Sequence, residues 1–422
     1  MTATPRAEHG SERELSDLPK IAMLYATFPQ PTETFVRREL KAMLNTGCRA
    51  VPFSIWRGGG EFHGTKVRCF RLRELWSLIW RVPFWLVARP RAFVEILSEL
   101  FRQSCPGIQN WNETFLGFGF ALVRASRMKQ EGFALCHAIW ATMPASAALA
   151  IKKLVGIEFS MGGHAYDVFR GRGDWLLECK LRQAAFVRTS SASAQKRLLE
   201  LGVAKEKLKL IYRGLYKWPK SSSHGSDLAP LRILSVGRLV EKKGYFEQLA
   251  IYRALQQAGI PFRARIVGGG PLDDKLKREN RRLDLDDKVF FLGSLPEDAT
   301  FELYSETDIF FFTGKVAGNG DRDGLPNVIP EAMSAGIVVI TSSTGGAAEA
   351  LEDGKTGFVR NPQNPLEWVE LLEHLRASPE RVLHLRKSAE KAARRLFDVT
   401  RTARELTACL LEASRKCPEN PK

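Results

Sequence analysis

The sequence predicts an α/β protein built from two doubly wound domains, each a parallel sheet with helices on both faces. From residue 231 onward, short apolar strands bounded by glycine alternate with helices. The same alternation begins near residue 20. Between the two series, residues 217–227 are polar, rich in Ser and Gly and without hydrophobic periodicity, as is typical of a linker. A chain of 422 residues also exceeds the roughly 250–300 residues at which a single core stops growing.

The first series is predicted to form a domain that spans residues 20–218. We expect strands at residues 20–25, 50–55, 133–139 and 158–162, and helices at residues 33–44 and 145–154. Residues 1–19 are polar and charged, so we expect a disordered tail there rather than a signal peptide. Residues 219–229 are expected to link the two domains.

The second series is predicted to form a domain that spans residues 230–397. We expect strands at residues 231–236, 262–267, 288–292, 308–313 and 337–341. The helices between them are expected at residues 244–258, 272–283 and 296–305, with a further helix after Pro326. A final helix is predicted at residues 398–415.

The composition favours an anionic partner and reduced thiols. The formal net charge is +16, which suits nucleic acid, anionic lipid or a phosphorylated ligand. Because no RRM, zinc-finger or helix-turn-helix signature accompanies the charge, a nucleic-acid partner is not expected. The seven cysteines are scattered and lack C-x-x-C spacing, which fits a cytoplasmic protein better than a disulfide framework or a zinc site.

Residues 68–104 form a basic aromatic segment in which Trp76, Trp80 and Trp85 are interleaved with arginines. Its apolar stretch, residues 75–88, is shorter than the ~20 residues that span a bilayer. Tryptophan and arginine together suit the surface of an anionic membrane, where the protein would bind peripherally. An amphipathic helical insert packed on its own domain explains the same pattern, and the sequence does not decide between the two.

The most informative segment is residues 321–336, where two carboxylates, Asp323 and Glu331, stand eight residues apart. Pro326 suits the first turn of a helix because its φ is fixed near the helical value. The helix start favours an anion, and Glu331 follows about a turn further in. Backbone N–H groups at this start are expected from Gly324, Leu325, Asn327 and Val328. This combination suits a phosphorylated sugar, because carboxylates accept hydrogen bonds from hydroxyls while N–H groups hold phosphate.

This segment resembles the signature of retaining glycosyltransferases of the GT-B fold, in the large family 4 that uses nucleotide-sugar donors. The family pattern is E-G-x-P-x-x-x-x-E-A-M-A-x-G, and Asp323 stands here in place of its first Glu. The resemblance implies two Rossmann-like domains facing a central cleft, with a nucleotide-diphosphate-sugar as co-substrate and no cofactor. It also implies that the C-terminal helix crosses back onto the first domain.

A basic block, residues 237–244, follows the first strand of the second domain. Arg238 lies just past the strand and Lys243 five residues on, so the two cations can clamp a diphosphate from two sides. The family's G-R-L-x-x-x-K-G motif implies the same role and places Gly237 beside the donor. The neighbouring Lys242 is expected to be a solvated lysine.

Further loops resemble the family's donor and acceptor loops. The run of glycines at residues 268–270 stands where the family has G-x-G-P, which implies that Gly269 and Gly270 line the nucleotide pocket. Leu295 lies in the loop that resembles the one framing the base. His164 matches a loop whose His sits beside the transferred sugar, and Arg188 is a weaker candidate partner for phosphate. Glu349 resembles the family's G-x-x-E and is expected to support its loop.

Residues 27–35 resemble the P-x-x-S-E-T-F loop of enzymes that assemble exopolysaccharide and lipopolysaccharide, including colanic acid and amylovoran. In the strand around His137, the family's second His is replaced by Ile139, so we expect that strand to be structural. Asp321 and Asp323 mimic a D-x-D metal motif, but we expect no metal because the cations already neutralise a diphosphate.

The sequence therefore predicts a retaining glycosyltransferase with Arg238, Lys243, Asp323, Glu331 and His164 as its catalytic residues. The expected acceptor is a glycan or lipid-linked oligosaccharide in the cytoplasm, at the inner face of the membrane. The alternative is a basic membrane- or nucleic-acid-binding protein that keeps the fold without transferase activity. A phosphorylase or epimerase is disfavoured, because no cofactor lysine or inverting site is indicated.

Overall fold

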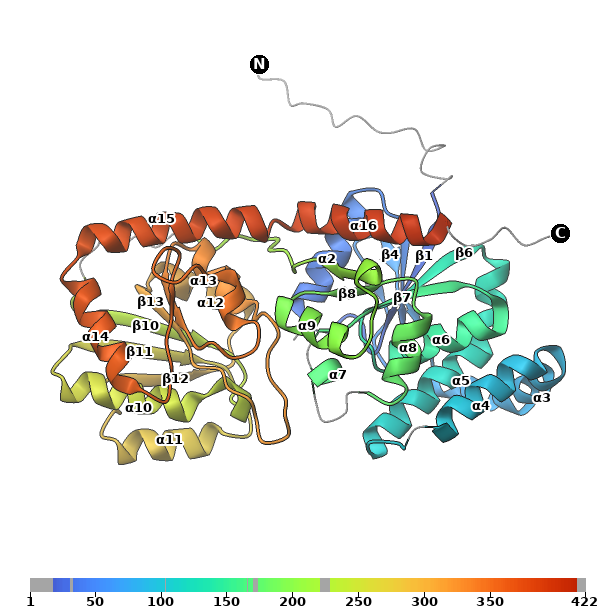
Figure 1. Ribbon diagram of the computed structural model, residues 1–422, viewed down its shortest axis with the longest axis horizontal. Helices are drawn as coiled ribbons and strands as arrows, with labels where there is room; N and C mark the ends of the chain where they lie inside the picture. Colours follow the sequence, from blue (N-terminus) through green and yellow to red (C-terminus); the bar gives the residue numbers. More distant parts are fainter. Residues whose placement is uncertain are drawn as a thin grey trace, which may run out of the picture.

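The computed structural model describes residues 18–30, 33–102, 104–164, 166–169, 174–220 and 228–415, and it folds into two α/β lobes (Figure 1). The predicted tail at residues 1–19 and the predicted linker at residues 219–229 lie mostly outside the described residues. Within these ranges the two lobes carry a seven-stranded and a six-stranded sheet, and both sheets are parallel. The expected α/β class with two doubly wound sheets is confirmed.

In the first lobe, the strands lie in the order β5-β2-β1-β6-β7-β8-β9. Their bounds are β1 Lys20–Tyr25, β2 Ala50–Ser54, β5 Arg68–Cys69, β6 Phe133–Ala138, β7 Glu158–Gly162, β8 Val187–Thr189 and β9 Leu208–Leu210. A small antiparallel hairpin joins β3 Glu61–Phe62 to β4 Thr65–Lys66. The direction in which the strands are added to the sheet reverses between β1 and β6. Ligands of such sheets bind beside this switch point, outside the carboxyl ends of the strands.

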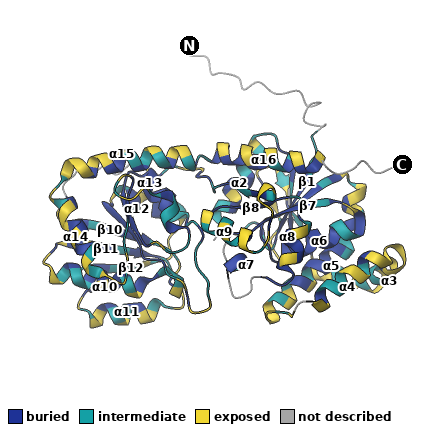
Figure 2. Ribbon diagram, in the orientation of Figure 1, coloured by how far each residue is buried: buried dark blue, intermediate teal, exposed yellow. Residues whose placement is uncertain are grey.

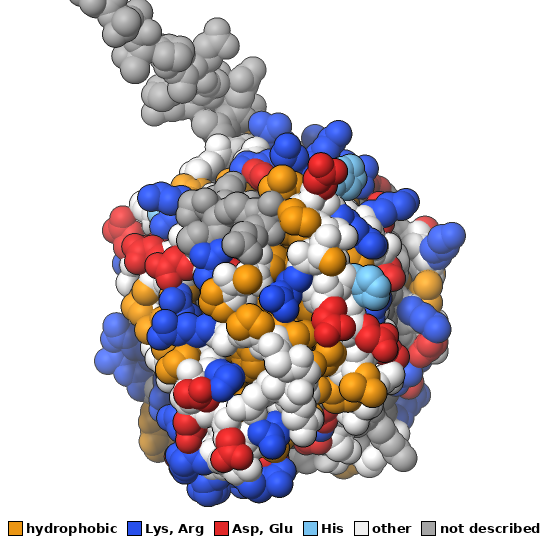
Figure 3. Space-filling model, turned by 90° about the vertical axis from the view of Figure 1, so that its left-hand side faces the viewer, with side chains coloured by type: hydrophobic (Ala, Val, Ile, Leu, Met, Phe, Trp, Pro, Cys, Tyr) orange, Lys and Arg blue, Asp and Glu red, His pale blue; other side chains and the backbone are white. Residues whose placement is uncertain are grey.

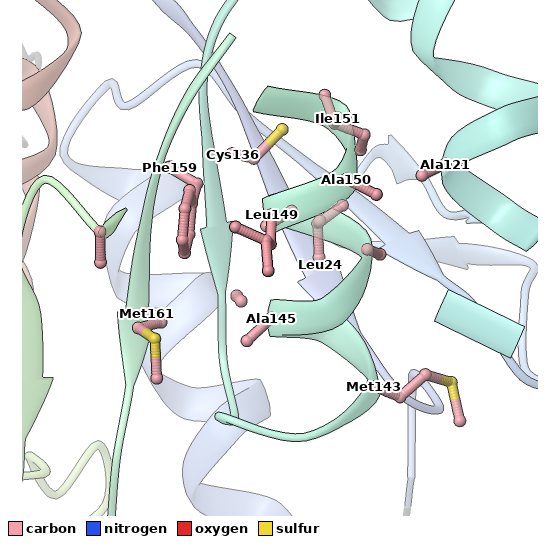
Figure 4. Close-up of a cluster of buried hydrophobic side chains, with 14 of the residues drawn as sticks. Leu24, Ala121, Cys136, Met143, Ala145, Leu149, Ala150, Ile151, Phe159 and Met161 are labelled. Carbon is pink, nitrogen blue, oxygen red and sulfur yellow. The ribbon is translucent and has the colours of Figure 1, made fainter. Parts of the chain in front are cut away.

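The helices of the first lobe cover both faces of its sheet (Figure 1). They are α2 Thr34–Asn45, α3 Leu78–Ala88, α4 Pro90–Arg102, α5 Ile108–Gln130, α6 Met143–Val155, α7 Tyr166–Phe169, α8 Leu177–Gln183 and α9 Ala192–Glu200, with 3₁₀ turns η1 Leu72–Ser77 and η2 Lys205–Lys207. Figure 4 shows how α6 closes the core, since Ala145 and Leu149 point toward the strands that carry Cys136 and Phe159. These side chains are almost completely buried, which is the main favourable term in folding.

In the second lobe, the order is β12-β11-β10-β13-β14-β15, with the reversal between β10 and β13. The strands are β10 Leu231–Val236, β11 Phe262–Val267, β12 Val289–Gly293, β13 Ile309–Phe312, β14 Val338–Thr341 and β15 Phe358–Val359. The helices of this lobe are α10 Tyr245–Gln257, α11 Asp273–Arg282, α12 Glu297–Ser305, α13 Val328–Ser334, α14 Pro365–Arg376 and α15 Pro379–Leu396, with 3₁₀ turns η3 Glu241–Lys243 and η4 Ala347–Ala350. The last helix, α16 Val399–Arg415, packs on the first lobe.

The C-terminal helices run along one side of both lobes, with α15 over the second and α16 over the first (Figure 1). The apolar stripe of α16, which includes Ala403, Leu406 and Leu410, is buried in one cluster with β1 and α2. The chain passes from the first lobe to the second after Leu215 and returns to the first lobe after Phe397. These two crossings are joined by a hydrogen bond, in which the Leu215 N–H donates to the Phe397 carbonyl at 2.7 Å. The two crossings therefore lie side by side.

The basic aromatic segment forms η1, α3 and α4 in the long connection between β5 and β6. One side of it packs on its own lobe, because Trp85, Ala92 and Leu100 are buried and the Trp85 indole donates to the carbonyl of Leu122. The other side remains exposed (Figure 2). Among the described residues, we find no helix that is long and apolar enough to cross a membrane.

Because His137 of β6 is buried, we expect the free energy of unfolding to depend on pH. Burial first, and Arg188 second, lower the pKa of His137 from 6.5 to about 3. Its stabilising contribution is therefore complete above pH 6.5 and falls as the pH drops toward 3, because the unfolded chain takes up a proton that the native state lacks. The loss is up to about 1.4 kcal/mol per pH unit.

We expect His137→Gln to show a shallower fall in the free energy of unfolding between pH 7 and pH 5 than the parent chain, as measured by urea titration. His374→Gln, at an exposed histidine of α14, is the control and should leave the slope unchanged. Equal slopes in the parent and in His137→Gln would contradict the expectation.

Candidate functional site

A lysine and a carboxylate predicted for the donor site meet at the switch point of the second lobe. Lys243 ends η3, just after β10, and Asp323 lies on the loop that follows β13. Lys243 Nζ lies 2.8 Å from Asp323 Oδ2 and 4.9 Å from the centre of the Phe312 ring. Burial alone would raise the pKa of Asp323, but Lys243 and Lys242 outweigh it and hold the pKa below its usual value. The ion pair therefore presents a charged lysine and an ionised carboxylate side by side.

Lys242 is the first correction, because the expectation of a solvated lysine is wrong. Its Nζ lies 3.1 Å from Asp321 and 3.4 Å from Asp323, and only 19% of its side chain is exposed. Both carboxylates of the D-x-D-like segment thus face lysines. Arg322 between them extends toward the first lobe, with its guanidinium carbon 4.3 Å from the centre of the Phe169 ring.

The glycine-rich loop after β11 packs against the basic block. Gly268 has φ +141°, and a Cβ there would lie 1.9 Å from the carbonyl oxygen of Gly237. A Cβ on Gly270 would similarly lie 2.5 Å from the carbonyl oxygen of Leu239. The glycines therefore allow one loop to approach the other, as well as any ligand. Arg238 lies on the outer side of this contact and is exposed.

Gly269 and Leu295 belong to neighbouring loops at the same end of the sheet. A Cβ on Gly269 would lie 2.9 Å from the hydroxyl of Ser294, the residue before Leu295. The structure thus brings together, at the carboxyl ends of β10, β11 and β12, Lys243 and the predicted donor residues Gly237, Gly269, Gly270 and Leu295.

The signature helix differs from the expectation. α13 begins at Val328 and its N-cap is Asn327, so Pro326 precedes the helix instead of occupying its first turn. The Ile329 N–H donates to the Pro326 carbonyl at 3.1 Å, which is a tight i+3 turn before the first α-helical bond. Glu331 consequently lies in the first turn of a seven-residue helix, closer to its start than predicted.

The loop before α13 is held by close backbone contacts. A Cβ on Gly345, at φ +62°, would lie 2.0 Å from the carbonyl oxygen of Asp323. A Cβ on Gly324 would lie 2.7 Å from the carbonyl oxygen of His164 in the other lobe. Gly324 and Leu325 therefore lie where the lobes meet, beside the predicted catalytic histidine.

Glu331 forms hydrogen bonds with residues of both lobes. Its Oε1 accepts a hydrogen bond from Arg38 of α2 at 3.1 Å, and its Oε2 accepts one from the Tyr304 hydroxyl at 3.2 Å. Arg38 also bonds to Glu297. Burial raises the pKa of Glu331 above its usual value, and Arg38 offsets this only in part. Among the described residues, no ion pair joins Glu331 to the Lys243 pair, so the structure presents two charged centres.

Sequence reasoning did not single out Arg38, which lies 293 positions from Glu331. The only signal for it was its place on the helix that follows the family-like loop at residues 27–35. That signal does not distinguish it from its exposed neighbour Arg37.

His164 is buried at the carboxyl end of β7, with 2% of its surface exposed. Its Nδ1 lies 3.3 Å from the Ser190 hydroxyl, and Trp140 approaches its ring edge-on at 5.4 Å between centroids. Burial first, then Arg213, lowers its pKa well below the usual value. The ring is therefore neutral near pH 7 and suited to a hydrogen bond with a hydroxyl.

Arg188 does not have free donors for a phosphate, and that interpretation is corrected. Its guanidinium binds Glu39 through two nitrogens, at 2.8 and 3.3 Å, and donates to the Ile211 carbonyl. His137 likewise has a buried partner, since its Nδ1 lies 2.8 Å from the Ser160 hydroxyl.

Glu349 joins the two lobes. Its carboxylate accepts hydrogen bonds from the N–H groups of Ala192 and Ser193 at the start of α9, at 2.5 and 2.6 Å. A carboxylate at a helix N-terminus is favoured by the exposed N–H groups and by the helix dipole.

Comparison with known proteins identifies the second lobe. Residues 217–395 match the family model described as "Glycosyl transferases group 1". The second lobe therefore carries the similarity to glycosyl transferases group 1. The matched segment contains the basic block, the signature and Glu349, whereas His164 lies in the first lobe.

Among its relatives is the amylovoran biosynthesis glycosyltransferase AmsK of Erwinia amylovora, 34% identical over 166 residues. A GDP-mannose-dependent alpha-(1-6)-phosphatidylinositol monomannoside mannosyltransferase of Mycolicibacterium smegmatis is 34% identical over 131 residues. These matches cover 39% and 30% of this chain, and 41% and 34% of the relatives. The chain thus matches about two fifths of AmsK and a third of the mannosyltransferase.

Solved structures resemble the chain over both lobes. Anabaena Alr3699/HepE in complex with UDP has a TM-score of 0.68 at 18% identity, and the match covers 93% of this chain and 100% of the HepE chain. Sucrose-phosphate synthase from Thermosynechococcus elongatus has a TM-score of 0.70 at 17% identity, and the match covers 92% of this chain and 98% of that one. At this identity the similarity shows the fold, which is the expected GT-B arrangement.

We expect Glu349→Gln to lower the free energy of unfolding by roughly 1–3 kcal/mol, because two hydrogen bonds to a charged acceptor across the lobes are weakened. Urea titration would measure the loss, and small-angle X-ray scattering should show a larger radius of gyration. Glu352→Gln, at a neighbouring exposed position, is the matched control. A loss of the same size in both variants would show that the contact between the lobes is not the cause.

Proposed function

We propose that this protein transfers a sugar from a nucleotide-diphosphate-sugar to a hydroxyl of a growing glycan, with the anomeric configuration retained. The observation that carries the proposal is the Lys243–Asp323 pair at the switch point of the second lobe, within the segment that matches glycosyl transferases group 1. HepE, which resembles the chain in fold, has been solved in complex with UDP-glucose, and this supports a nucleotide-sugar donor.

Each predicted catalytic residue has a role in this proposal. Lys243 and Arg238 stabilise the negative charge that builds on the leaving diphosphate, where electrostatic catalysis gains most. Asp323 holds sugar hydroxyls, and Glu331 holds the ribose in place of its contact with Arg38. His164, as a neutral ring, orients the reacting sugar.

The transfer needs no covalent intermediate with a carboxylate of the chain. The acceptor hydroxyl oxygen forms its bond to the anomeric carbon on the face from which the diphosphate departs. As the anomeric carbon–oxygen bond breaks, the nucleoside diphosphate leaves with the electron pair. One of its phosphate oxygens takes the proton of the hydroxyl. The meeting of the lobes excludes water, because hydrolysis competes with transfer.

We expect Lys243→Ala to lower the turnover of the nucleotide-sugar by about 100-fold, the usual effect of removing one donor to a developing anion. Glu331→Gln should raise KM more than it lowers kcat, since it removes a binding contact. Lys275→Ala, at an exposed lysine of α11, is the control. Turnover within threefold of the parent in Lys243→Ala would reject the proposal and favour a binding protein with this fold.

We further propose that the acceptor is a lipid-linked glycan of exopolysaccharide or lipopolysaccharide biosynthesis, reached from the cytoplasmic face of the membrane. The similarity to AmsK, named for amylovoran biosynthesis, supports this class of acceptor. The support for peripheral membrane contact comes from the surface of the first lobe.

The exposed apolar side chains of the chain are concentrated in residues 72–115, which we name the docking face. Trp76 and Trp80 are 74% and 71% exposed, and Phe101 is 88% exposed. The others are Leu72, Ile79, Phe84, Leu86, Val87, Val94, Leu97, Ile108, Trp111 and Phe115. Such a concentration of exposed large apolar side chains favours an interaction site.

The charges of the docking face suit an anionic bilayer. Arg73, Arg89 and Arg91 are exposed, and within the described ranges none of them forms an ion pair. Three acids of the segment, in contrast, are paired: Glu74 with Arg124, Glu95 with Lys153, and Glu99 with Arg182. The fourth, Glu113, accepts a hydrogen bond from Gln109. Exposed Trp rings and unpaired Arg side chains fit lipid headgroups. At the other end of the molecule, Lys and Arg are interspersed with Asp and Glu and with apolar side chains (Figure 3).

We expect the parent chain to sediment with vesicles that contain phosphatidylglycerol and not with pure phosphatidylcholine vesicles at 0.15 M salt. The Trp76→Ala/Trp80→Ala variant should bind at least tenfold more weakly. Leu366→Ala/Leu383→Ala, at exposed apolar positions of the second lobe, is the control. Equal sedimentation of the parent and the Trp variant would remove the docking face from the proposal.

A further inference from the structure

Four strands of the first lobe bring one cluster of side chains together at their carboxyl ends. Phe35 comes from the helix after β1, Trp140 follows β6, His164 follows β7 and Arg213 follows β9. The guanidinium carbon of Arg213 lies 3.8 Å from the centre of the Phe35 ring and 5.2 Å from that of Trp140. The rings of Phe35 and Trp140 lie 6.2 Å apart, edge to face.

The backbone fixes the position of Arg213. A Cβ on the next residue, Gly214, would lie 2.2 Å from the Cα of Val399, so the chain passes directly against the start of α16. Leu215 then bonds to Phe397 at the crossing between the lobes. Arg213 is therefore held beside the crossing between the lobes.

Arg213 carries a charge that the described part of the chain does not balance with an ion pair. The acids nearest to it have other partners. Glu39 is bound by Arg188 through two hydrogen bonds, and Asp167 accepts from the N–H groups of Ala141 and His164 at 3.2 and 3.1 Å. For Glu33, the remaining acid, burial raises the pKa and the charge of Arg213 offsets this only in part, and no ion pair joins the two among the described residues.

Arg213 remains a cation at neutral pH. Burial first, and Arg188 second, lower its pKa from 12.5 to about 9, which is still above 7. A half-buried cation that packs between aromatic rings and forms no ion pair is costly, so such residues are usually kept for a ligand. The planar guanidinium matches the two oxygens of a carboxylate or a phosphate.

We infer that Arg213, held against Phe35 and Trp140, binds a phosphate or carboxylate group of the acceptor and selects an anionic acceptor over a neutral one. This inference rests on the proposed transferase function. Arg213 lies on the first lobe, whereas Lys243 and Asp323 lie on the second, so the group it binds is separate from the donor diphosphate. Its neighbour His164 places the subsite beside the predicted reaction centre.

The experiment separates the two sources of anion. UDP and GDP are tested first by thermal shift, and the one that stabilises the parent is then held at saturation to occupy the diphosphate subsite. Inorganic phosphate, glucuronate and neutral glucose are titrated against this complex at constant ionic strength. We expect the parent to bind glucuronate and phosphate at least tenfold more tightly than glucose.

In Arg213→Gln, this preference should fall by about tenfold or more, because a charge-assisted pair of hydrogen bonds is lost. The affinity for the nucleoside diphosphate should stay within twofold of the parent. Arg213→Lys keeps the charge without the fork and should bind the anions with intermediate affinity. Arg197→Gln, on the surface of α9, is the matched control and should behave as the parent.

Three results would overturn the inference. They are a parent that does not distinguish glucuronate from glucose, an Arg213→Gln variant that keeps the preference, and an Arg213→Gln variant whose nucleoside diphosphate affinity falls tenfold. The last would assign Arg213 to the donor. If neither nucleoside diphosphate stabilises the parent, the proposed function fails by itself, and the anion titration without nucleotide still tests Arg213.

Discussion

Charged contacts between the two lobes hold them together, and the rest of the site depends on these contacts. Arg38 reaches Glu331 and Glu297, while Glu349 accepts hydrogen bonds from the start of α9. The four apolar clusters each lie mainly within one lobe or join it to a crossing segment. Polar contacts of this kind can be exchanged for contacts to a ligand at small net cost, which a continuous apolar core could not.

The same reasoning explains why the predicted donor residues are paired with one another. A lysine and an aspartate on one sheet edge neutralise each other until a ligand arrives. In the proposed function, a diphosphate would replace the carboxylate at Lys243 and leave Asp323 to accept hydrogen bonds from sugar hydroxyls. Glu331 would likewise exchange Arg38 for the ribose, which would couple ligand binding to the contact between the lobes.

The sequence predicted most of the elements that form the sheets, and the reason is local. The strands at residues 20–25 and 158–162 match their expected bounds, because each is a short run dominated by apolar residues. The basic block and the signature could also be recognised, since each lies within a few residues of a strand end. The start of α13 was misplaced, because a proline fits both a tight turn and a first helical turn.

What could not be predicted depends on contacts between distant positions. Nothing in the local pattern distinguishes Arg38 from Arg37, or shows that Arg188 is neutralised by a glutamate 149 positions away. The environment of Lys242 was misjudged for the same reason, since its acidic partners come from the loop after β13. Pairing of charges is a property of the fold, and it decides which cations are left for a ligand.

The hydrogen bond between Leu215 and Phe397 has a mechanical consequence. Because the two chain crossings are bonded to each other on one side of the molecule, they form a hinge. The lobes can rotate about this hinge but cannot slide freely past one another. A small rotation about the hinge moves apart the parts of the two lobes that lie far from the crossings, while the parts near the crossings scarcely move. Substrates of any length would therefore enter from the side opposite the paired crossings.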